Sequence, residues 1–217
     1  MNRTDIKKNI LQKTDEVSPY SNTDEQWDLL IEGMLDDTAN KFMRVIPIEL
    51  IEAGDCCNFI PYQQRSHGTQ FYVDLAFVYL PKDYNRFLYA RTQHWRRMAT
   101  EKDLFSTESG EYHRQFDIHT RAGVAKPKVF LEPATVYSRR FIVSPFRQNW
   151  HLIDLEFHYV KRIKAEQMQE DILDGFFYFA ASHVLTSMRQ PEFAKAMMEK
   201  FYEFLSLSTI SNKRIHK

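Results

Sequence analysis

The middle of the chain contains a cluster in which cationic and aromatic side chains alternate. Its members are Arg91, His94, Trp95, Arg96 and Arg97, and further basic groups follow at Arg139-Arg140, Arg147, Lys161-Arg162 and Lys164. Arginine beside an aromatic ring is typical of platforms on which single-stranded nucleic acid stacks. The same pairing is typical of the hot spots of protein interfaces. The cluster therefore indicates a binding surface and leaves the partner open.

The distribution of charge helps to choose between these partners. Residues 1–81 contain 7 basic and 13 acidic groups, residues 82–164 contain 16 and 9, and residues 165–217 contain 6 and 7. The whole chain has no net charge, whereas nucleic-acid binders usually carry an excess of positive charge. We therefore favour contacts between complementary protein surfaces and keep single-stranded nucleic-acid binding as the alternative. The candidate interface residues are Arg91, Trp95, Arg96, Arg97, Arg139, Arg140, Lys213 and Arg214.

Signatures of catalysis and of metal binding are missing from the sequence. The eight histidines form no HExxH motif, and there is no CxxC, GxSxG or SxxK. The six glycines are scattered and supply no loop that could hold a phosphate. Adjacent Cys56 and Cys57 have no third cysteine to pair with, which excludes a disulfide framework within the chain. We expect no catalytic residues, no cofactor, no metal and no enzymatic activity.

Both ends of the chain carry helical patterns. Residues 1–21 are polar and are expected to form a flexible arm, followed by a first helical part over 22–69 whose strongest stripe runs from Trp27 to Val45. Residues 165–207 predict a helical hairpin broken before Pro191, and 208–217 a flexible basic tail. The most apolar stretch, 172–185, is too short and too polar to cross a bilayer, so no membrane contact is expected.

Between the helical parts, residues 70–164 show the alternation of strands. Within them, 96–125 is polar and has few apolar anchors, which predicts a projecting arm or extended hairpin. The sequence thus predicts an α+β protein. Its N-terminal helix and C-terminal hairpin would form a bundle, with an antiparallel β insertion and a long arm.

The order of these elements resembles the head-to-tail adaptor, or head-completion, proteins of short-tailed bacteriophages. The matching pieces are Trp27-Asp28-Leu29-Leu30 to Asn40-Lys41-Phe42, Val45-Ile46-Pro47, Tyr79-Leu80-Pro81-Lys82-Asp83-Tyr84, Lys126-Pro127-Lys128-Val129, Trp150 to Tyr159, Asp174-Gly175 to Ala180-Ala181 and Gln190 to Ala196. They span about residues 22–205. The aromatic-rich, glycine-poor composition is similar to that of ring proteins of crAss-like phages.

The resemblance implies a structural role in the virion. Such subunits form a homo-oligomeric ring, commonly a dodecamer, beneath the portal protein, and they extend the channel through which double-stranded DNA passes. Other ring or tail proteins attach to them, and the resemblance places the chain at the head–tail junction after assembly in the host cytoplasm. The family offers no catalytic residues to carry over.

Overall fold

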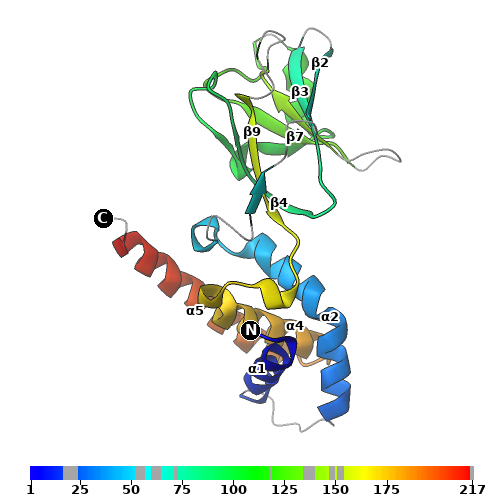
Figure 1. Ribbon diagram of the computed structural model, residues 1–217, viewed down its shortest axis with the longest axis vertical. Coiled ribbons are helices and arrows are strands. Elements are labelled where there is room, and N and C mark those ends of the chain that lie inside the picture. Colours follow the sequence, from blue (N-terminus) through cyan, green and yellow to red (C-terminus); the bar gives the residue numbers. More distant parts are fainter. Residues whose placement is uncertain are drawn as a thin grey trace. The chain divides into compact units, whose positions relative to one another are not determined.

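The computed structural model describes residues 1–16, 24–51, 57–59, 65–70, 73–117, 119–133, 140–146, 150 and 154–215. The chain divides into two compact units. Both chain ends, Met1–Cys56 and Arg162–Lys217, form the first, here called the helical unit. Residues Cys57–Lys161 form the second, here called the β unit (Figure 1). The predicted α+β class is confirmed.

The helical unit is built from α1 (Arg3–Asp15), α2 (Asp24–Val45), α4 (Leu173–Ser187) and α5 (Pro191–Ile215), with short 3₁₀ turns η1 (Ile48–Leu50), η6 (Ala165–Gln167) and η7 (Glu170–Ile172). α4 packs against α5, α1 and α2. This arrangement follows from its composition, because ten of its residues are buried and it can be covered only from several sides.

Aromatic rings fill the centre of the helical unit. Phe42 of α2 is fully buried, and its ring centroid lies 5.6 Å from that of Phe176, 5.7 Å from Phe179 and 5.8 Å from Phe201. These separations suit edge-to-face and tilted ring packing, which adds to the gain from burying apolar area. The three helices α2, α4 and α5 therefore meet at one side chain.

The turn between α4 and α5 ends one helix and begins the next within a few residues. Arg189 has a φ of 58°, which is the left-handed conformation. The backbone N–H of Arg189 donates to Thr186 O and that of Gln190 donates to Leu185 O, at 3.0 and 2.9 Å. This pattern satisfies the last carbonyls of α4, and Pro191 then begins α5 at a position where a missing N–H costs nothing.

Gly175 permits close approach of α4 to α5. A Cβ atom on Gly175 would lie 2.4 Å from Cε1 of Phe204, so the Phe204 ring would have to move.

We expect Gly175→Ala to lower the free energy of unfolding by about 1–3 kcal/mol. Guanidinium denaturation followed by helical circular dichroism measures this change. The control is Gly33→Ala on α2, where a Cβ meets nothing within 4 Å. It should raise the free energy of unfolding by about 0.5–1 kcal/mol, and equal effects of both changes would contradict the argument.

The β unit contains two sheets. One has the order β1 (Cys57–Phe59), β9 (Glu156–Lys161), β4 (Tyr84–Arg91) and β5 (Ala99–Thr100). The other has the order β2 (Arg65–Gln70), β3 (Val73–Tyr79), β8 (Arg140–Ser144), β7 (Lys128–Leu131) and β6 (Leu104–Ser106). All pairings are antiparallel except that of β6 with β7. Buried residues of both sheets join one core, where Phe141 of β8 lies 5.6 Å from Phe87 of β4 and 4.7 Å from Phe157 of β9.

The expected flexible arm over residues 1–21 differs from the structure. Residues 3–15 form α1, which begins because the Asn2 side chain accepts a hydrogen bond from Asp5 N–H at 2.8 Å. Ile6 and Ile10 are fully buried, so two apolar residues one turn apart hold the helix. Residues 17–21 of the expected arm lie outside the described part of the chain.

The expected projecting arm over residues 96–125 also differs from the structure. This segment forms β5, η3 (Glu101–Asp103), β6, α3 (Gly110–His113) and η4 (Arg114–Phe116), and β6 joins the second sheet. Gln115 is buried and its side chain accepts a hydrogen bond from Ala122 N–H at 2.7 Å. Polar side chains therefore organise a segment that has too few apolar residues to show a strand or helix pattern.

The expected boundaries of the β insertion and of the C-terminal tail also differ from those in the structure. The β insertion expected over 70–164 corresponds to a unit that begins at Cys57, because β1 and β2 precede residue 70. The expected flexible tail over 208–217 continues as α5 to Ile215. Cys56 lies outside the described residues, and Cys57 is described only as part of the β1 backbone.

Candidate interaction surfaces

The predicted cationic cluster lies on the β unit, but its arginines are not equivalent. Arg91 is exposed and pairs with Glu156 across β4 and β9, with Nε 2.6 Å from Oε2. Arg97 makes two hydrogen bonds of 2.6 Å to the carboxylate of Asp103. The side chain of Arg96 is exposed. The charges of Arg91 and Arg97 are therefore largely matched by carboxylates of the same unit.

Trp95 was expected at an interaction surface and instead belongs to the core of the β unit. It is 7% exposed, and its Nε1–H donates to the carbonyl oxygen of Pro145 at 2.9 Å. An indole needs such an acceptor when it is buried. Trp95 therefore positions the loop that carries Arg96 and Arg97 and does not itself offer a binding face.

The remaining predicted interface residues fall in different places. Arg140 on β8 pairs with Glu132 at 2.5 Å, and its guanidinium lies 4.3 Å from the centroid of the Phe77 ring. Arg139 lies outside the described residues, and for Lys213 and Arg214 only the α5 backbone is described. Of the predicted interface residues, the structure therefore exposes Arg91, Arg96 and Arg97, buries Trp95, and pairs Arg140 with Glu132 on a different sheet.

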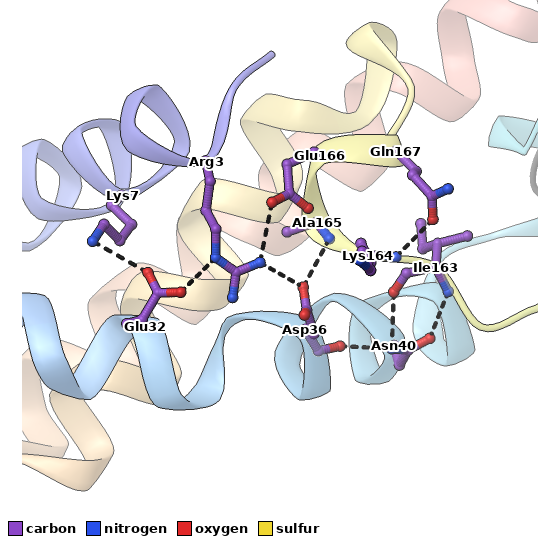
Figure 2. A network of polar contacts seen from close by, with 10 residues as sticks. All are labelled: Arg3, Lys7, Glu32, Asp36, Asn40, Ile163, Lys164, Ala165, Glu166 and Gln167. Carbon is purple, nitrogen blue, oxygen red and sulfur yellow. Dashed lines mark hydrogen bonds and ion pairs between the residues drawn. The ribbon is translucent and has the colours of Figure 1, made fainter.

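The most extensive polar contact of the helical unit fastens α1 to α2 and η6. Arg3 reaches three carboxylates, with its Nε 2.6 Å from Glu32 and its Nη1 3.1 Å from Asp36 and 3.2 Å from Glu166. Lys7, one turn later, lies 2.8 Å from Asp28 and 3.2 Å from Glu32. We call this group the α1 latch; it comprises Arg3, Lys7, Asp28, Glu32, Asp36 and Glu166, most of which appear in Figure 2.

The segment that enters the helical unit from β9 is fixed beside the latch. The Asn40 side chain accepts a hydrogen bond from Ile163 N–H and donates one to Ile163 O, both at 3.0 Å. Asp36 Oδ1 accepts the Ala165 N–H at 3.1 Å. As Figure 2 shows, Asp36 is thus shared between Arg3 and the backbone of this segment. The latch therefore joins the first helix to residues more than a hundred positions away.

The α1 latch should be sensitive to acid. Hydrogen bonds from Arg3 and then Lys7 hold the pKa of Glu32 below its ordinary value. Because the pKa is lowered on folding, the contribution of Glu32 is complete above the ordinary glutamate pKa of about 4.3 and is lost as the pH falls through the lowered value.

We expect an acid titration followed by NMR of the α1 amides to show undocking of α1 below about pH 4 in the wild type. Glu32→Gln should remove much of this pH dependence and weaken docking at neutral pH. Identical titration curves for the two proteins would show that Glu32 does not hold α1.

Among the described residues of the helical unit, five large apolar side chains are exposed: Met1, Leu29, Val45, Tyr202 and Leu207. Leu29 on α2 is 73% exposed, and Tyr202 and Leu207 on α5 are 59% and 68% exposed. Phe204 lies against Gly175 near the start of α4, so α5 runs on for about 16 Å beyond that contact (Figure 1). Leu207 lies beyond that contact and its side chain is exposed, so it is a candidate for coverage by another chain.

These outward residues were not among the sequence-predicted interface residues. The signal that could have identified them is a large apolar residue off the main stripe of an amphipathic helix, as Leu29 is relative to Trp27, Ile31 and Leu35. Single exposed apolar residues are common on protein surfaces. Leu207 carries more weight than the others because it lies on α5 beyond the contact of Phe204 with Gly175.

Pockets, metal sites and membrane-spanning helices are the remaining features that bear on function. A pocket of about 380 Å³ on the β unit is lined by Leu104, Phe105, Ser106, Leu131 and Pro133, without a titratable side chain. Within the described ranges, no group of three or more histidine, cysteine, aspartate or glutamate residues is placed to hold a metal ion. No helix in that same part of the chain has both the length and the hydrophobicity that a membrane span needs.

Comparison with known proteins adds no relative. No family model matches the chain, and no curated protein matches its sequence.

Proposed function

We propose that this chain is a structural subunit of a virion, forming a homo-oligomeric ring at the head–tail junction of a short-tailed phage. The observation that carries the proposal is the projecting end of α5, with Leu207 68% exposed on a helix that continues beyond its α4 partner. In this proposal a neighbouring copy covers that end. The ring meets the portal protein on one side and further ring or tail proteins on the other, and double-stranded DNA passes through it.

The distribution of charge supports a contact between unlike surfaces. The α5 end carries Lys213 and Arg214, whereas η7 and the first turn of α4 carry the exposed Glu170, Asp171 and Asp174, which lie outside the α1 latch. A contact between a basic face of one copy and an acidic face of the next is heterologous, and such contacts close into rings when the rotation between copies fits. Complementary charge would also set the orientation of each copy.

The pairing of the β unit's arginines argues against the alternative of single-stranded nucleic-acid binding. Binding to phosphates requires cations that can exchange their counterions for the ligand. Arg91, Arg97 and Arg140 instead make close contacts with Glu156, Asp103 and Glu132. Contact with DNA in the proposed ring would accordingly be weak, as passage through a channel requires.

Exposed leucines provide the test of this proposal. Leu207→Ser and Leu29→Ser should leave the free energy of unfolding within about 0.5 kcal/mol of wild type, since both side chains are exposed. If a neighbour buries Leu207, its loss costs about 1.5–3 kcal/mol per contact and raises the concentration needed for assembly by roughly 10- to 100-fold.

Light scattering across a concentration series measures both the assembly and its loss. Lys195→Ser, an exposed polar change on the same helix, serves as the matched control and should assemble like wild type. Unchanged assembly of Leu207→Ser would remove the α5 end from the interface.

A further inference from the structure

The contacts that hold α1 comprise buried residues along one face of the helix, the latch pairs, and a hydrogen bond from Lys13 Nζ to the Tyr178 hydroxyl at 3.1 Å. Ile6, Ile10 and Thr14 are its buried residues, spaced four apart, and α1 packs on α4, α2 and η6. The rest of α1 has exposed or half-exposed side chains. The groove therefore recognises α1 chiefly through two isoleucine side chains and the cations of Arg3 and Lys7.

The charges on the two sides of this groove are complementary and directional. Near its start α1 presents Arg3 and Lys7 to the carboxylates of α2 and η6. Near its end, Glu16 meets Lys200 of α5 at 2.8 Å. A reversed helix would bring Glu16 toward Glu32 and Arg3 toward Lys200, both repulsive. The groove therefore recognises one helix in one orientation.

The same helix is available on every copy of the chain. Glu16 and Asp24 are separated by seven residues, which can span on the order of 25 Å when extended. A helix whose connection to α2 has this reach can leave its own groove and enter an identical groove next to it, where it makes the same contacts. Exchange of an identical element is an economical route to association, and neighbours in a ring supply the second groove at high effective concentration.

We propose that α1 docks in the groove of a second copy of this chain when the subunits assemble, so that the α1 latch forms between neighbours. Arg3 and Lys7 of one copy then pair with Asp28, Glu32, Asp36 and Glu166 of the next. This inference rests on the proposed ring function, because it needs copies held side by side. It assigns to the ring an interface that is separate from the α5 end.

Cross-linking distinguishes exchange from docking within one chain. In a background with Cys56→Ala and Cys57→Ala, the pair Lys7→Cys and Asp28→Cys places two thiols across the latch, while Arg3 keeps its three carboxylates. A short bis-maleimide is applied to the assembled full-length chain. Exchange gives a ladder of covalent multimers on a denaturing gel, whereas docking within one chain gives a single monomer band. Lys8→Cys with Asp28→Cys is the matched control, because Lys8 is exposed, and it should give no ladder.

Mixing of charge-reversed copies provides a second test that does not depend on the cysteine variants. One copy carries Lys7→Glu, and the other carries Asp28→Lys and Glu32→Lys. Each should assemble at least tenfold more weakly than wild type on its own. An equal mixture should recover assembly if α1 crosses between copies. Recovery only when all three changes are placed in one chain would overturn the exchange.

The outcomes separate this inference from the ring function. Rings seen by electron microscopy together with a monomer band overturn the exchange and leave the ring function standing. A ladder without rings supports the exchange and contradicts the ring. Rings with a ladder support both, and neither rings nor ladder contradicts both.

Discussion

Replacing Phe42 with alanine is expected to lower the free energy of unfolding of the helical unit by about 3–5 kcal/mol. Phe42 is fully buried and contacts Phe176, Phe179 and Phe201, so its loss leaves a cavity where α2, α4 and α5 meet. A change of this size is a large fraction of the 5–15 kcal/mol that stabilises an ordinary domain. Guanidinium denaturation followed at the helical circular dichroism signal measures it.

Leu29→Ala is the matched control for Phe42→Ala, because it removes a large apolar side chain from the same helix at a position that is 73% exposed. Its expected effect on unfolding is within about 0.5 kcal/mol. A loss below about 1 kcal/mol for Phe42→Ala would mean that the helices do not meet at this residue.

Trp95→Ala should destabilise the β unit by about 3–5 kcal/mol. The indole is buried among Phe146, Val143 and other residues of the core, and its N–H satisfies Pro145 O. Trp95→Phe keeps most of the ring volume but leaves that carbonyl without its donor, so it should cost roughly 1–3 kcal/mol.

Hydrogen exchange measured by mass spectrometry on peptides of the β unit reports both changes. Arg96→Ala, the adjacent exposed position, should leave exchange unchanged. Equal effects of Trp95→Ala and Arg96→Ala on exchange would contradict the burial of Trp95 and would support the surface position that the sequence pattern predicted.

Helical periodicity predicted the parts of the fold that bury wide apolar faces. The α2 stripe, with Trp27, Ile31, Leu35 and Phe42 all buried, was visible because burial of many residues on one side of a helix leaves a regular spacing. The break before Pro191 was visible because proline restricts the backbone before it.

Local patterns could not predict the elements that depend on distant partners. α1 buries only Ile6, Ile10 and the polar Thr14, too few apolar residues to mark a stripe. The pair of Arg3 with Glu166 joins residues 163 positions apart, and no spacing in the sequence records it. Trp95 was predicted at the surface because a tryptophan among arginines gives the same sequence pattern whether its side chain faces solvent or the core. Burial decides the difference, and burial is set by the whole sheet.

Charged residues of the β unit and those of the α1 latch differ in the elements that they join. Arg91, Arg97 and Arg140 pair with carboxylates of the β unit itself, whereas the α1 latch pairs charges of elements that lie far apart along the chain. Partly exposed ion pairs add little stability, about 0–1 kcal/mol each. Their value lies in selecting the partner and its orientation, which suits an assembly made of identical copies.

Electron microscopy of the purified full-length chain, alone and mixed with a phage portal protein, is the decisive experiment for the proposed ring. We expect closed rings of identical subunits around a channel wide enough for duplex DNA, and loss of those rings when Leu207 is replaced by serine. Particles with the mass of one chain at every concentration, with and without the portal protein, would contradict it.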